Sequence, residues 1–259
     1  MPTWNAHQYL KFAEERIRPC RDLVARIDIA APRRIVDLGC GPGNSAVVLK
    51  ERWPGAEIVG VDSSKEMIDV ARKEQPEGKW VAGDIWDWAR EAGGELEKFD
   101  IVFSNAALQW VGNHAALFPA LMSRVAAGGA LAVQIPADFD AVPHRLMREL
   151  SRELAPAVKA KEWYSHEPGF YYDLLAGRAA RVDIWEAIYQ HVLPNAEAIV
   201  EWYKGSGMRP FLEAMGSEEE REKFVARYTE RIREAYPVRA DGRVLFPFRR
   251  LFVVGWVPV

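Results

Sequence analysis

A glycine-rich loop constrains what this chain can fold into more than any other segment. The apolar run 35–38 leads into Gly39, Gly41 and Gly43, and a helical pattern begins directly after them. Glycine permits a sharp turn and lets a ligand approach the backbone, where a Cβ atom would collide with it. The spacing differs from the dinucleotide-binding fingerprint, because Asn44 stands where that fingerprint has glycine or alanine. The segment predicts a strand, a ligand-binding loop and a helix, with a purely structural turn as the alternative.

Short apolar runs alternate with helical patterns between residues 33 and 134. We expect strands at 35–38, 58–61, 80–82, 99–103 and 130–135, and helices at 44–52 and 115–125. Ser63 and Glu66 have the spacing of a capping box that opens a further helix. Residues 128–129, both glycine, are expected to end a helix and form a turn. Strands that alternate with helices predict crossover connections and hence a parallel sheet of the α/β class.

The segments on either side of this core have different patterns. Tyr9, Phe12 and Arg16 share one helical face before Pro19, which is expected to break the helix. Farther along, strands are expected at 182–193 and 244–257, with a helix between them that Ser217 and Glu220 would cap. We therefore expect four segments, namely a helical cap (1–30), a ligand-binding core (31–136), an aromatic-rich helical lid insertion (137–181) and a C-terminal segment (182–259) that completes the sheet and the substrate pocket.

The composition excludes several classes of protein. The 259 residues include 34 Lys or Arg and 37 Asp or Glu, giving a net charge of −3, whereas a non-specific nucleic-acid binder is usually strongly basic. The uncharged apolar stretches are shorter than the roughly 18 residues that cross a membrane, and the first residues lack a signal-peptide pattern. The two cysteines form no disulfide framework and fit a reducing compartment. We expect a cytoplasmic protein with no metal, no nucleic acid and no membrane partner; a monomer is compatible with the sequence, which leaves the oligomeric state open.

Polar residues follow three of the expected strands. Asp62 ends the second strand, Asp84 and Ile85 follow the third, and Ser104 and Asn105 follow the fourth. The carboxyl ends of parallel strands lie at one edge of a sheet, where such folds bind ligands. A carboxylate such as Asp62 can accept hydrogen bonds from two vicinal ribose hydroxyls, and Asp84 from an adenine amino group with Ile85 packed on the ring. The alternative for Asp62 is an acidic residue that the dipole of the next helix favours.

This ordered set resembles the Rossmann-like class I S-adenosylmethionine-dependent methyltransferases over about residues 30–136. The resemblance is carried by the residues Asp37, Gly39, Gly41, Gly43, Asp62, Gly83, Asp84, Ile85, Ser104 and Asn105. It implies a seven-stranded, mostly parallel sheet whose last strand is antiparallel, and residues 244–257 would supply that strand. It also implies S-adenosyl-L-methionine as the cofactor and S-adenosyl-L-homocysteine as the product.

The resemblance implies a role for each part of the site. The glycine loop would pass the methionine part, Asp62 would hold the ribose, and the main chain at 104–105 would hold the methionine amine. Arg16 could meet the methionine carboxylate, with Tyr9 on the same helical face; the alternative for Arg16 is an ordinary surface residue. The expected cofactor-binding residues are Asp37, Gly39, Gly41, Gly43, Asp62, Ser63, Asp84, Ile85, Ser104, Asn105, Tyr9 and Arg16.

A narrower resemblance runs nearly from end to end and is to the trans-aconitate 2-methyltransferases. It is carried by Trp4 to Arg16, by Asn105-Ala106-Ala107-Leu108-Gln109-Trp110, by Trp202-Tyr203-Lys204-Gly205 with Arg209-Pro210, and by Phe246-Pro247-Phe248-Arg249-Arg250. Ser206 departs from the threonine of that family's pattern but keeps a hydroxyl group. The resemblance implies a small unsaturated polycarboxylate as the substrate and its methyl ester as the product.

A carboxylate acceptor determines which residues the site needs. Carboxylic acids titrate near pH 4, so the nucleophile is already ionised at neutral pH and no catalytic general base is needed. Fixed cations are needed for the remaining carboxylates, and arginine offers bidentate geometry. The expected substrate-binding residues are Trp110, His114, Tyr171, Tyr172, Arg209, Arg249 and Arg250. The alternatives are a buried structural ion pair for Arg249 or Arg250, a solvated loop residue for Arg209, and core or surface roles for the aromatic residues and His114.

Four alternative functions remain on the sequence alone, of which two are open and two are disfavoured. The chain could methylate another free or carrier-bound acid, or it could bind S-adenosylmethionine without transferring the methyl group. A nicotinamide dehydrogenase is disfavoured by Asn44. Amino methylation of nucleic acids is disfavoured because the fourth strand ends in Ser-Asn-Ala-Ala rather than the Asx-Pro-Pro-aromatic loop of those enzymes.

Overall fold

The computed structural model describes residues 13–90, 97–156 and 163–259 and divides into two compact units. The sheet unit consists of Glu14–Ala137, Tyr164–Ala187 and Arg250–Val259. The helical unit is built mainly from Asp138–Trp163 and Ile188–Arg249. Residues 138–163 and 164–181 thus belong to different units. The division into a cap, a core, a lid and a C-terminal segment stays a prediction.

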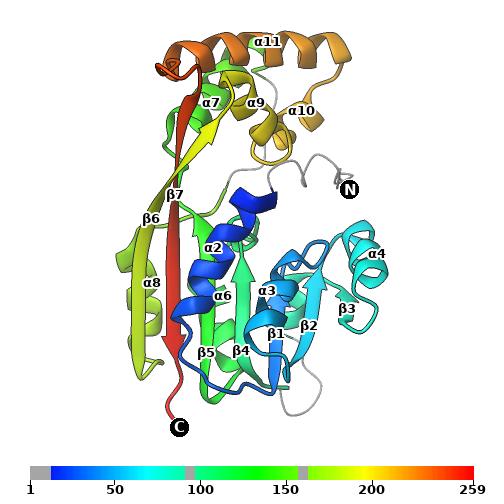
Figure 1. Cartoon of the computed structure of the whole chain (residues 1–259), viewed down its shortest axis with the longest axis vertical. Helices are drawn as coiled ribbons and strands as arrows, with labels where there is room; N and C mark the ends of the chain where they lie inside the picture. The colour runs from blue at the N-terminus through cyan, green and yellow to red at the C-terminus, as the bar shows by residue number, and fades with distance from the viewer. Residues whose placement is uncertain (1–12, 91–96, 157–162) are drawn as a thin grey trace. The chain divides into compact units, whose positions relative to one another are not determined.

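A seven-stranded sheet runs in the order β3-β2-β1-β4-β5-β7-β6. Its strands are β1 (Arg34–Leu38), β2 (Glu57–Asp62), β3 (Lys79–Ala82), β4 (Phe99–Asn105), β5 (Val125–Pro136), β6 (Arg181–Leu193) and β7 (Val244–Trp256). The first five pair in parallel, while β7 pairs antiparallel to β5, and the arrowheads in Figure 1 show the reversal. This confirms the predicted seven-stranded, mostly parallel sheet with an antiparallel last strand.

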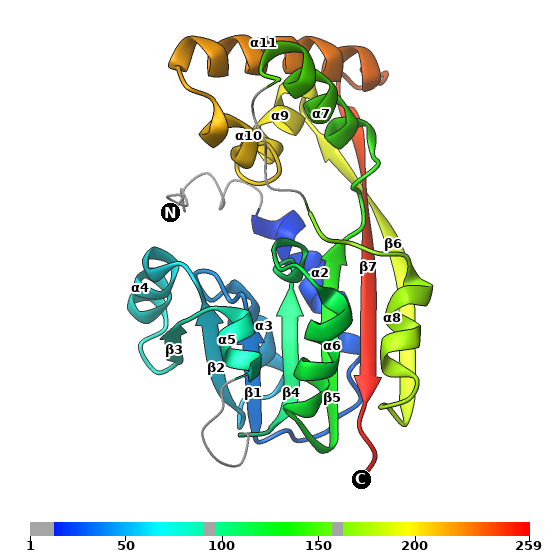
Figure 2. The same cartoon turned by 180° about the vertical axis from the view of Figure 1, so that it is seen from behind.

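Helices lie on both faces of the sheet. In Figures 1 and 2, α2 (Ala13–Arg26) and α3 (Asn44–Arg52) lie on one face, and α5 (Ile85–Arg90), α6 (His114–Ser123) and α8 (Pro168–Leu175) lie on the other. Helix α4 (Lys65–Glu74) packs through Ile68 and Ala71 against Ala46 of α3 and Trp80 of β3. This arrangement leaves the carboxyl edge of the sheet as the place where polar side chains can meet a ligand.

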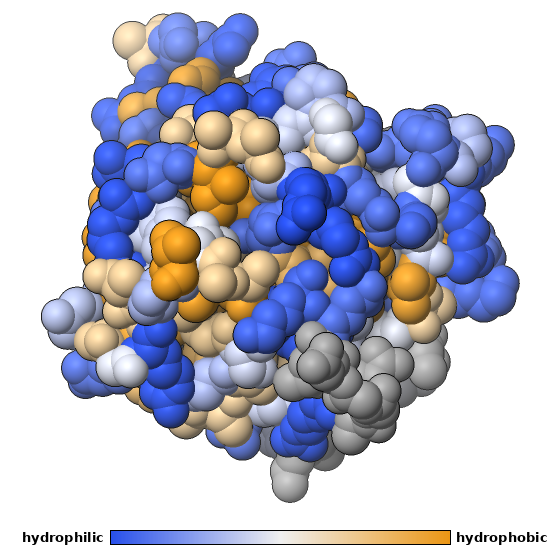
Figure 3. Space-filling model, turned by 90° about the horizontal axis from the view of Figure 1, so that it is seen from below, coloured by the Kyte–Doolittle hydropathy of each residue, from blue (hydrophilic) through white to orange (hydrophobic). Residues whose placement is uncertain are grey.

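The outer surface carries its apolar side chains singly or in small groups. On the face shown in Figure 3, hydrophilic side chains predominate and apolar ones lie in separate patches. Exposed large apolar residues of the described chain include Val47, Val81, Tyr172 and Ile188, which come from different elements. Scattered residues of this kind are normal on a folded protein. Within the described residues, no helix combines the length and the apolar character needed to cross a membrane.

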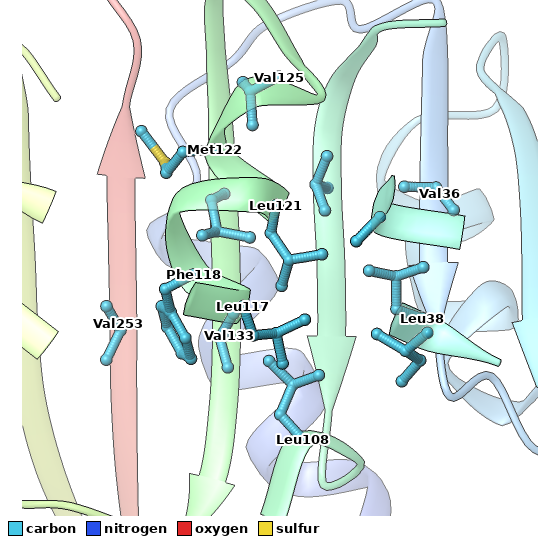
Figure 4. Close-up of a cluster of buried hydrophobic side chains, with 14 of the residues drawn as sticks. Val36, Leu38, Leu108, Leu117, Phe118, Leu121, Met122, Val125, Val133 and Val253 are labelled. Atoms are coloured by element: carbon cyan, nitrogen blue, oxygen red, sulfur yellow. The ribbon is translucent and has the colours of Figure 1, made fainter. Parts of the chain in front are cut away.

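The core of the sheet unit forms on the α6 side of the sheet. Figure 4 shows Val36 and Leu38 of β1, Val133 of β5 and Val253 of β7 with the apolar side chains of α6, and these residues are buried. Strands that are buried on both faces are expected to be nearly continuous in apolar residues, which explains why the apolar runs located them. A polar residue inside such a strand is therefore informative.

The helical unit has a core of its own. It contains α7 (Val142–Leu154), α9 (Ala196–Lys204), α10 (Arg209–Ala214) and α11 (Glu218–Ala235). The predicted stripe of α11, namely Phe224, Tyr228 and Ile232, is fully buried in this core together with Phe246 of β7. The capping box of Ser217 with Glu220 also forms as predicted.

Three local predictions were wrong, and the first two concern places where an element was expected to end. Pro19 does not break the first helix but lies inside α2, where burial of Cys20, Leu23 and Val24 favours continuation of the helix despite the lost hydrogen bond. Residues 128–129 lie within β5, not in a turn after a helix. They form an irregularity in its pairing with β4, and Gly128 has a positive φ of 71°, as glycine tolerates.

The third correction concerns the helix that follows β2. Its N-cap is Ser64, whose hydroxyl accepts a hydrogen bond from the Met67 backbone N–H at 3.3 Å, and not Ser63. We expect Ser64→Ala to lower the free energy of unfolding by about 0.5–2 kcal/mol, because the first turn of α4 loses that acceptor. Ser63→Ala, at the exposed neighbouring position, is the matched control and should be near neutral. Urea denaturation checks both variants, and equal losses would contradict the assignment of the cap.

Candidate active site

The glycine loop is fixed on one side and open on the other. Gly39, Gly41 and Gly43 all have positive φ angles of 72°, 54° and 92°, which side chains rarely adopt. The Gly39 and Cys40 N–H groups donate to the Val61 carbonyl of β2 at 2.7 and 3.1 Å. A Cβ atom on Gly39 would lie 2.1 Å from the Ala107 Cβ, whereas one on Gly41 would meet nothing within 4 Å. The loop therefore packs tightly against the segment that follows β4 and leaves open space next to Gly41.

Asp62 connects the glycine loop to α4. Its two carboxylate oxygens accept hydrogen bonds from the Gly41 N–H at 2.9 Å and from the Ser64 N–H at 2.8 Å. Burial raises the pKa of this carboxyl, while the two backbone hydrogen bonds lower it. A carboxylate has about four lone pairs, so two acceptor positions remain for a ligand. Two vicinal hydroxyl groups fit that capacity.

Asp37 is a fully buried carboxyl at the end of β1. Neither of its oxygens has a hydrogen-bond partner among the described residues. Burial, followed by the charge of Asp62, raises the pKa of Asp37 to about 8. Such an orphaned group is costly unless a ligand satisfies it, and a ligand with hydrogen-bond donors or a positive charge would do so.

The end of β4 offers a second acceptor. The Ser104 hydroxyl donates to the Leu38 carbonyl at 2.8 Å and thereby connects β4 to β1. The Asn105 Oδ1 atom is buried and lacks a partner within the described part of the chain. Asp37 pairs with Phe103, two residues before Asn105, so both side chains project from the same face of the sheet. Two acceptors on one face suit a group that donates several hydrogen bonds, such as an ammonium.

The residues after β3 have a structural role in addition to the predicted one. Asp84 is exposed, and its Oδ1 atom accepts from the Trp86 N–H at 2.7 Å at the start of α5. Ile85 is buried, with its Cδ1 atom 3.9 Å from a Cβ position on Gly39. Ile85 thus lies beside the glycine loop, as an adenine-packing residue would. Contact of either residue with adenine stays a prediction.

His114 and Tyr171 form a buried hydrogen-bonded pair. The His114 Nε2 atom lies 3.0 Å from the Leu108 carbonyl, and its Nδ1 atom lies 2.9 Å from the Tyr171 hydroxyl. Since the carbonyl can only accept, Nε2 carries the proton and Nδ1 accepts from Tyr171. Burial lowers the pKa of His114, which favours this neutral form. Both residues brace the segment after β4 that carries Trp110, while Tyr172 is exposed on α8; their contact with substrate stays a prediction.

The four predicted arginines are divided between the units. Arg250 of the sheet unit is 4% exposed, and its guanidinium donates to the Gln134 Oε1 atom at 3.2 Å. Arg16 of α2 is partly buried in the same unit. In the helical unit, the Arg249 N–H donates to Asp138 at 2.8 Å, and the Arg209 side chain donates to Glu213 at 2.6 Å. Tyr9 lies outside the described residues.

The sequence analysis missed Gln134. It is fully buried in β5, opposite Asn105 in the pairing with β4. Its signal in the sequence is a single polar side chain within the apolar run 130–135, which the strand pattern alone does not interpret. Across residues 13–90, 97–156 and 163–259, no group of three or more His, Cys, Asp or Glu residues could hold a metal ion.

Comparison with known proteins identifies the family. A family model described as a methyltransferase domain matches residues 12–207, which is more than half of the chain. The chain belongs to this methyltransferase family. The match includes the glycine loop, Asp62 and the end of β4, and it extends into the helical unit as far as α9.

Relatives of this methyltransferase match it from end to end. A protein of Azoarcus sp. (strain BH72) is 46% identical over 257 residues, covering 98% of this chain and 99% of its own. Proteins of Rhodopseudomonas palustris (strain BisB5) and Acidovorax ebreus (strain TPSY) are 44% and 46% identical, again over 98% of this chain and over 99% and 98% of their own. All three are named trans-aconitate 2-methyltransferase.

Solved structures share the fold at low sequence identity. The YcgJ protein of Bacillus subtilis has a TM-score of 0.60 at 15% identity and covers 93% of this chain and 99% of its own. Phosphoethanolamine N-methyltransferase 2 of Haemonchus contortus, solved in complex with S-adenosyl-L-methionine, has a TM-score of 0.56 at 17% identity. It covers 93% of this chain and 53% of its own. These similarities support the methyltransferase fold.

We expect Asp37→Asn to alter how stability depends on pH in the protein without ligand. With its raised pKa, Asp37 keeps its proton in the folded state up to about pH 8, whereas the unfolded chain loses it near pH 4. The folded state binds more protons in this range, so this group makes the wild type less stable as the pH rises through it. Asparagine has no such proton, and the variant should gain stability relative to the wild type between pH 5 and pH 8.

Urea denaturation at several pH values measures this difference. Asp173→Asn, at an exposed position of α8, is the matched control and should keep a constant difference from the wild type. A difference between Asp37→Asn and the wild type that does not change with pH would contradict the raised pKa.

Proposed function

We propose that this methyltransferase transfers a methyl group from S-adenosyl-L-methionine to a carboxylate of trans-aconitate. The assignment of trans-aconitate as the substrate rests on the 43–46% identity to relatives named trans-aconitate 2-methyltransferase. This identity extends over 98% of the chain. Identity of this extent includes the helical unit as well as the cofactor-binding core, so it bears on the acceptor and not on the cofactor alone. The products are a methyl ester and S-adenosyl-L-homocysteine.

The residues of the sheet unit fit the cofactor. The open side of the loop at Gly41 accommodates the methionine part, and the two remaining acceptor positions of Asp62 suit the ribose hydroxyls. The orphaned oxygens of Asp37 and Asn105 suit the ammonium group. When bound, S-adenosyl-L-methionine supplies an electrophilic methyl group on a positively charged sulfur. Asp84, Ile85, Ser63, Arg16 and Tyr9 complete the proposed cofactor set.

The protein contributes alignment rather than proton transfer. A carboxylate with a pKa near 4 is ionised at neutral pH, so no residue has to remove a proton from it. The neutral His114 ring, whose two nitrogens are both engaged in hydrogen bonds, fits a reaction without a general base. Holding the reacting atoms in line can lower the activation free energy by about 7–11 kcal/mol. A water-poor site adds to this, because attack of an anion on a cation cancels charge.

The remaining carboxylates of the acceptor need cations. Arg250 is a buried guanidinium near the carboxyl end of β5, where the register pairs it with Pro136. Its planar group can bind a carboxylate through two hydrogen bonds. Arg209 and Arg249 of the helical unit are further candidates for this role, and Trp110, His114, Tyr171 and Tyr172 are candidates for shaping the acceptor site.

A labelled-methyl assay tests the reaction. The purified protein is incubated with methyl-labelled S-adenosylmethionine and a set of di- and tricarboxylic acids that includes trans-aconitate. We expect a base-labile methyl ester of trans-aconitate and an equal amount of S-adenosylhomocysteine, both measured by mass spectrometry. If another acid is methylated faster, that acid replaces trans-aconitate as the proposed substrate. If the cofactor binds but no acid is methylated, the protein is a binding protein and not an enzyme.

Asp62 provides a separate test of the cofactor site. We expect Asp62→Ala to weaken S-adenosylmethionine binding by about 10- to 100-fold, because the ribose hydroxyls lose a charged acceptor and the Gly41 N–H loses its partner. Asp69→Ala, which removes an exposed carboxylate from α4, is the matched control and should bind as the wild type does. Isothermal titration calorimetry measures both affinities, and an unchanged affinity in Asp62→Ala would contradict the ribose assignment.

A further inference from the structure

A buried polar pair interrupts one face of the sheet between β5 and β7. Gln134 is fully buried and Arg250 is 4% exposed, and the Arg250 guanidinium donates to the Gln134 Oε1 atom at 3.2 Å. In the antiparallel register, Gln134 pairs with Phe252 and Pro136 pairs with Arg250. The two polar residues are therefore diagonal neighbours on adjacent strands. Such a pair needs an explanation, because both side chains are buried within strands whose sequences are mostly apolar.

The strand pattern places this pair on the face away from the α6 core. Val133 of β5 and Val253 of β7 point into that core (Figure 4). Side chains alternate along a strand, so Gln134 and Arg250 project to the opposite face. Asn105 is the register partner of Gln134 on β4 and projects with it. Polar groups at or near the carboxyl ends of β4 and β5 and in the middle of β7 thus share one side of the sheet.

The hydrogen bond to Arg250 fixes which way the Gln134 amide points. A guanidinium can only donate hydrogen bonds, so the amide oxygen must face it and the amide NH₂ must face elsewhere. That Nε2 atom is buried and forms no hydrogen bond with the part of the chain that the structure describes. Buried donors in folded proteins nearly always have a partner. The unmet donor therefore indicates that a ligand supplies the acceptor.

The hydrogen-bonding groups of Gln134 and Arg250 indicate which kind of ligand the pair can bind. The Gln134 NH₂ and the Arg250 guanidinium present donors only, and together they match the acceptor oxygens of a carboxylate. Gln134 orients the guanidinium without neutralising its charge, which a glutamate at the same position would do. Asp37 and Asn105 present the opposite character, with acceptor oxygens near the ends of β1 and β4. The donors of Gln134 and Arg250 thus belong to β5 and β7, and the acceptors of Asp37 and Asn105 belong to β1 and β4.

We propose that Gln134 determines specificity for the acceptor by donating its Nε2 hydrogens to a carboxylate that is not methylated, next to Arg250. This inference rests on the proposed methylation of a polycarboxylate and adds a recognition residue to it. The same donors could hold the methionine carboxylate of the cofactor, so the experiment has to distinguish the two sources of the carboxylate.

Two substitutions at Gln134 test the proposal. Gln134→Leu keeps the approximate size and removes the donor, and we expect it to raise the KM for trans-aconitate by about 10- to 100-fold. Gln134→Glu keeps the shape, adds a negative charge beside Arg250, and should raise the KM further. Both should leave the Kd for S-adenosylmethionine within twofold of the wild type. Gln190→Leu, at an exposed position of β6, is the matched control and should keep wild-type kinetics.

A comparison of acceptors separates recognition from a merely structural role. The wild type should have a higher KM for an unsaturated acid that lacks one carboxylate than for trans-aconitate. In Gln134→Leu this ratio should fall toward one, because the residue that recognises the extra carboxylate is gone. A structural defect would raise the KM for both acids alike and leave the ratio unchanged, which would overturn the proposal. A weakened Kd for S-adenosylmethionine with an unchanged KM for trans-aconitate would also overturn it and would assign the donors to the cofactor.

Binding measurements keep this inference separate from the proposed reaction. Calorimetry of trans-aconitate against the protein with S-adenosylhomocysteine reports recognition without turnover. If the wild type binds trans-aconitate, forms no ester, and Gln134→Leu binds it at least 10-fold more weakly, the reaction is wrong and the recognition residue stands. Equal binding by the wild type and Gln134→Leu, or no binding by the wild type, overturns the role of Gln134.

Discussion

A sheet that is buried on both faces restricts where polar side chains can lie, and the rest of this structure depends on that restriction. The apolar layer that α6 covers includes residues of β1, β4, β5 and β7. On the opposite face, the polar residues Asp37, Asn105 and Gln134 lie at or near the carboxyl ends of their strands. Ligand groups can satisfy them at that edge, which is why we propose these polar residues as part of the functional site.

The proposed site combines hydrogen-bond acceptors and hydrogen-bond donors on strands of one sheet. The glycine loop and the acceptor oxygens of Asp62, Asp37 and Asn105 suit a cationic cofactor that carries a ribose. Arg250 and Gln134 present donors that suit an anion. A reaction between a cation and an anion needs both kinds of group, and the sheet places them on different strands. The neutral His114 adds no charge to this arrangement.

The sequence predicted the elements whose signals are local and missed the contacts that join distant residues. The apolar runs located the strands, and Ser217 with Glu220 located the start of α11. Pro19 and residues 128–129 misled the analysis, because burial of α2 and the pairing of β5 outweighed local preference. The hydrogen bonds of His114 with Tyr171 and of Gln134 with Arg250 join residues 57 and 116 positions apart, and no spacing rule reaches that far.

The two backbone hydrogen bonds of Asp62 have a consequence for the energetics of binding. They hold the carboxylate between the Gly41 and Ser64 N–H groups in the protein without ligand. The directions of its remaining lone pairs are therefore set during folding, and the rotational freedom of the side chain is lost at that stage rather than on ligand binding. A preorganised acceptor of this kind lowers the entropic cost of association, so more of the interaction energy appears as affinity.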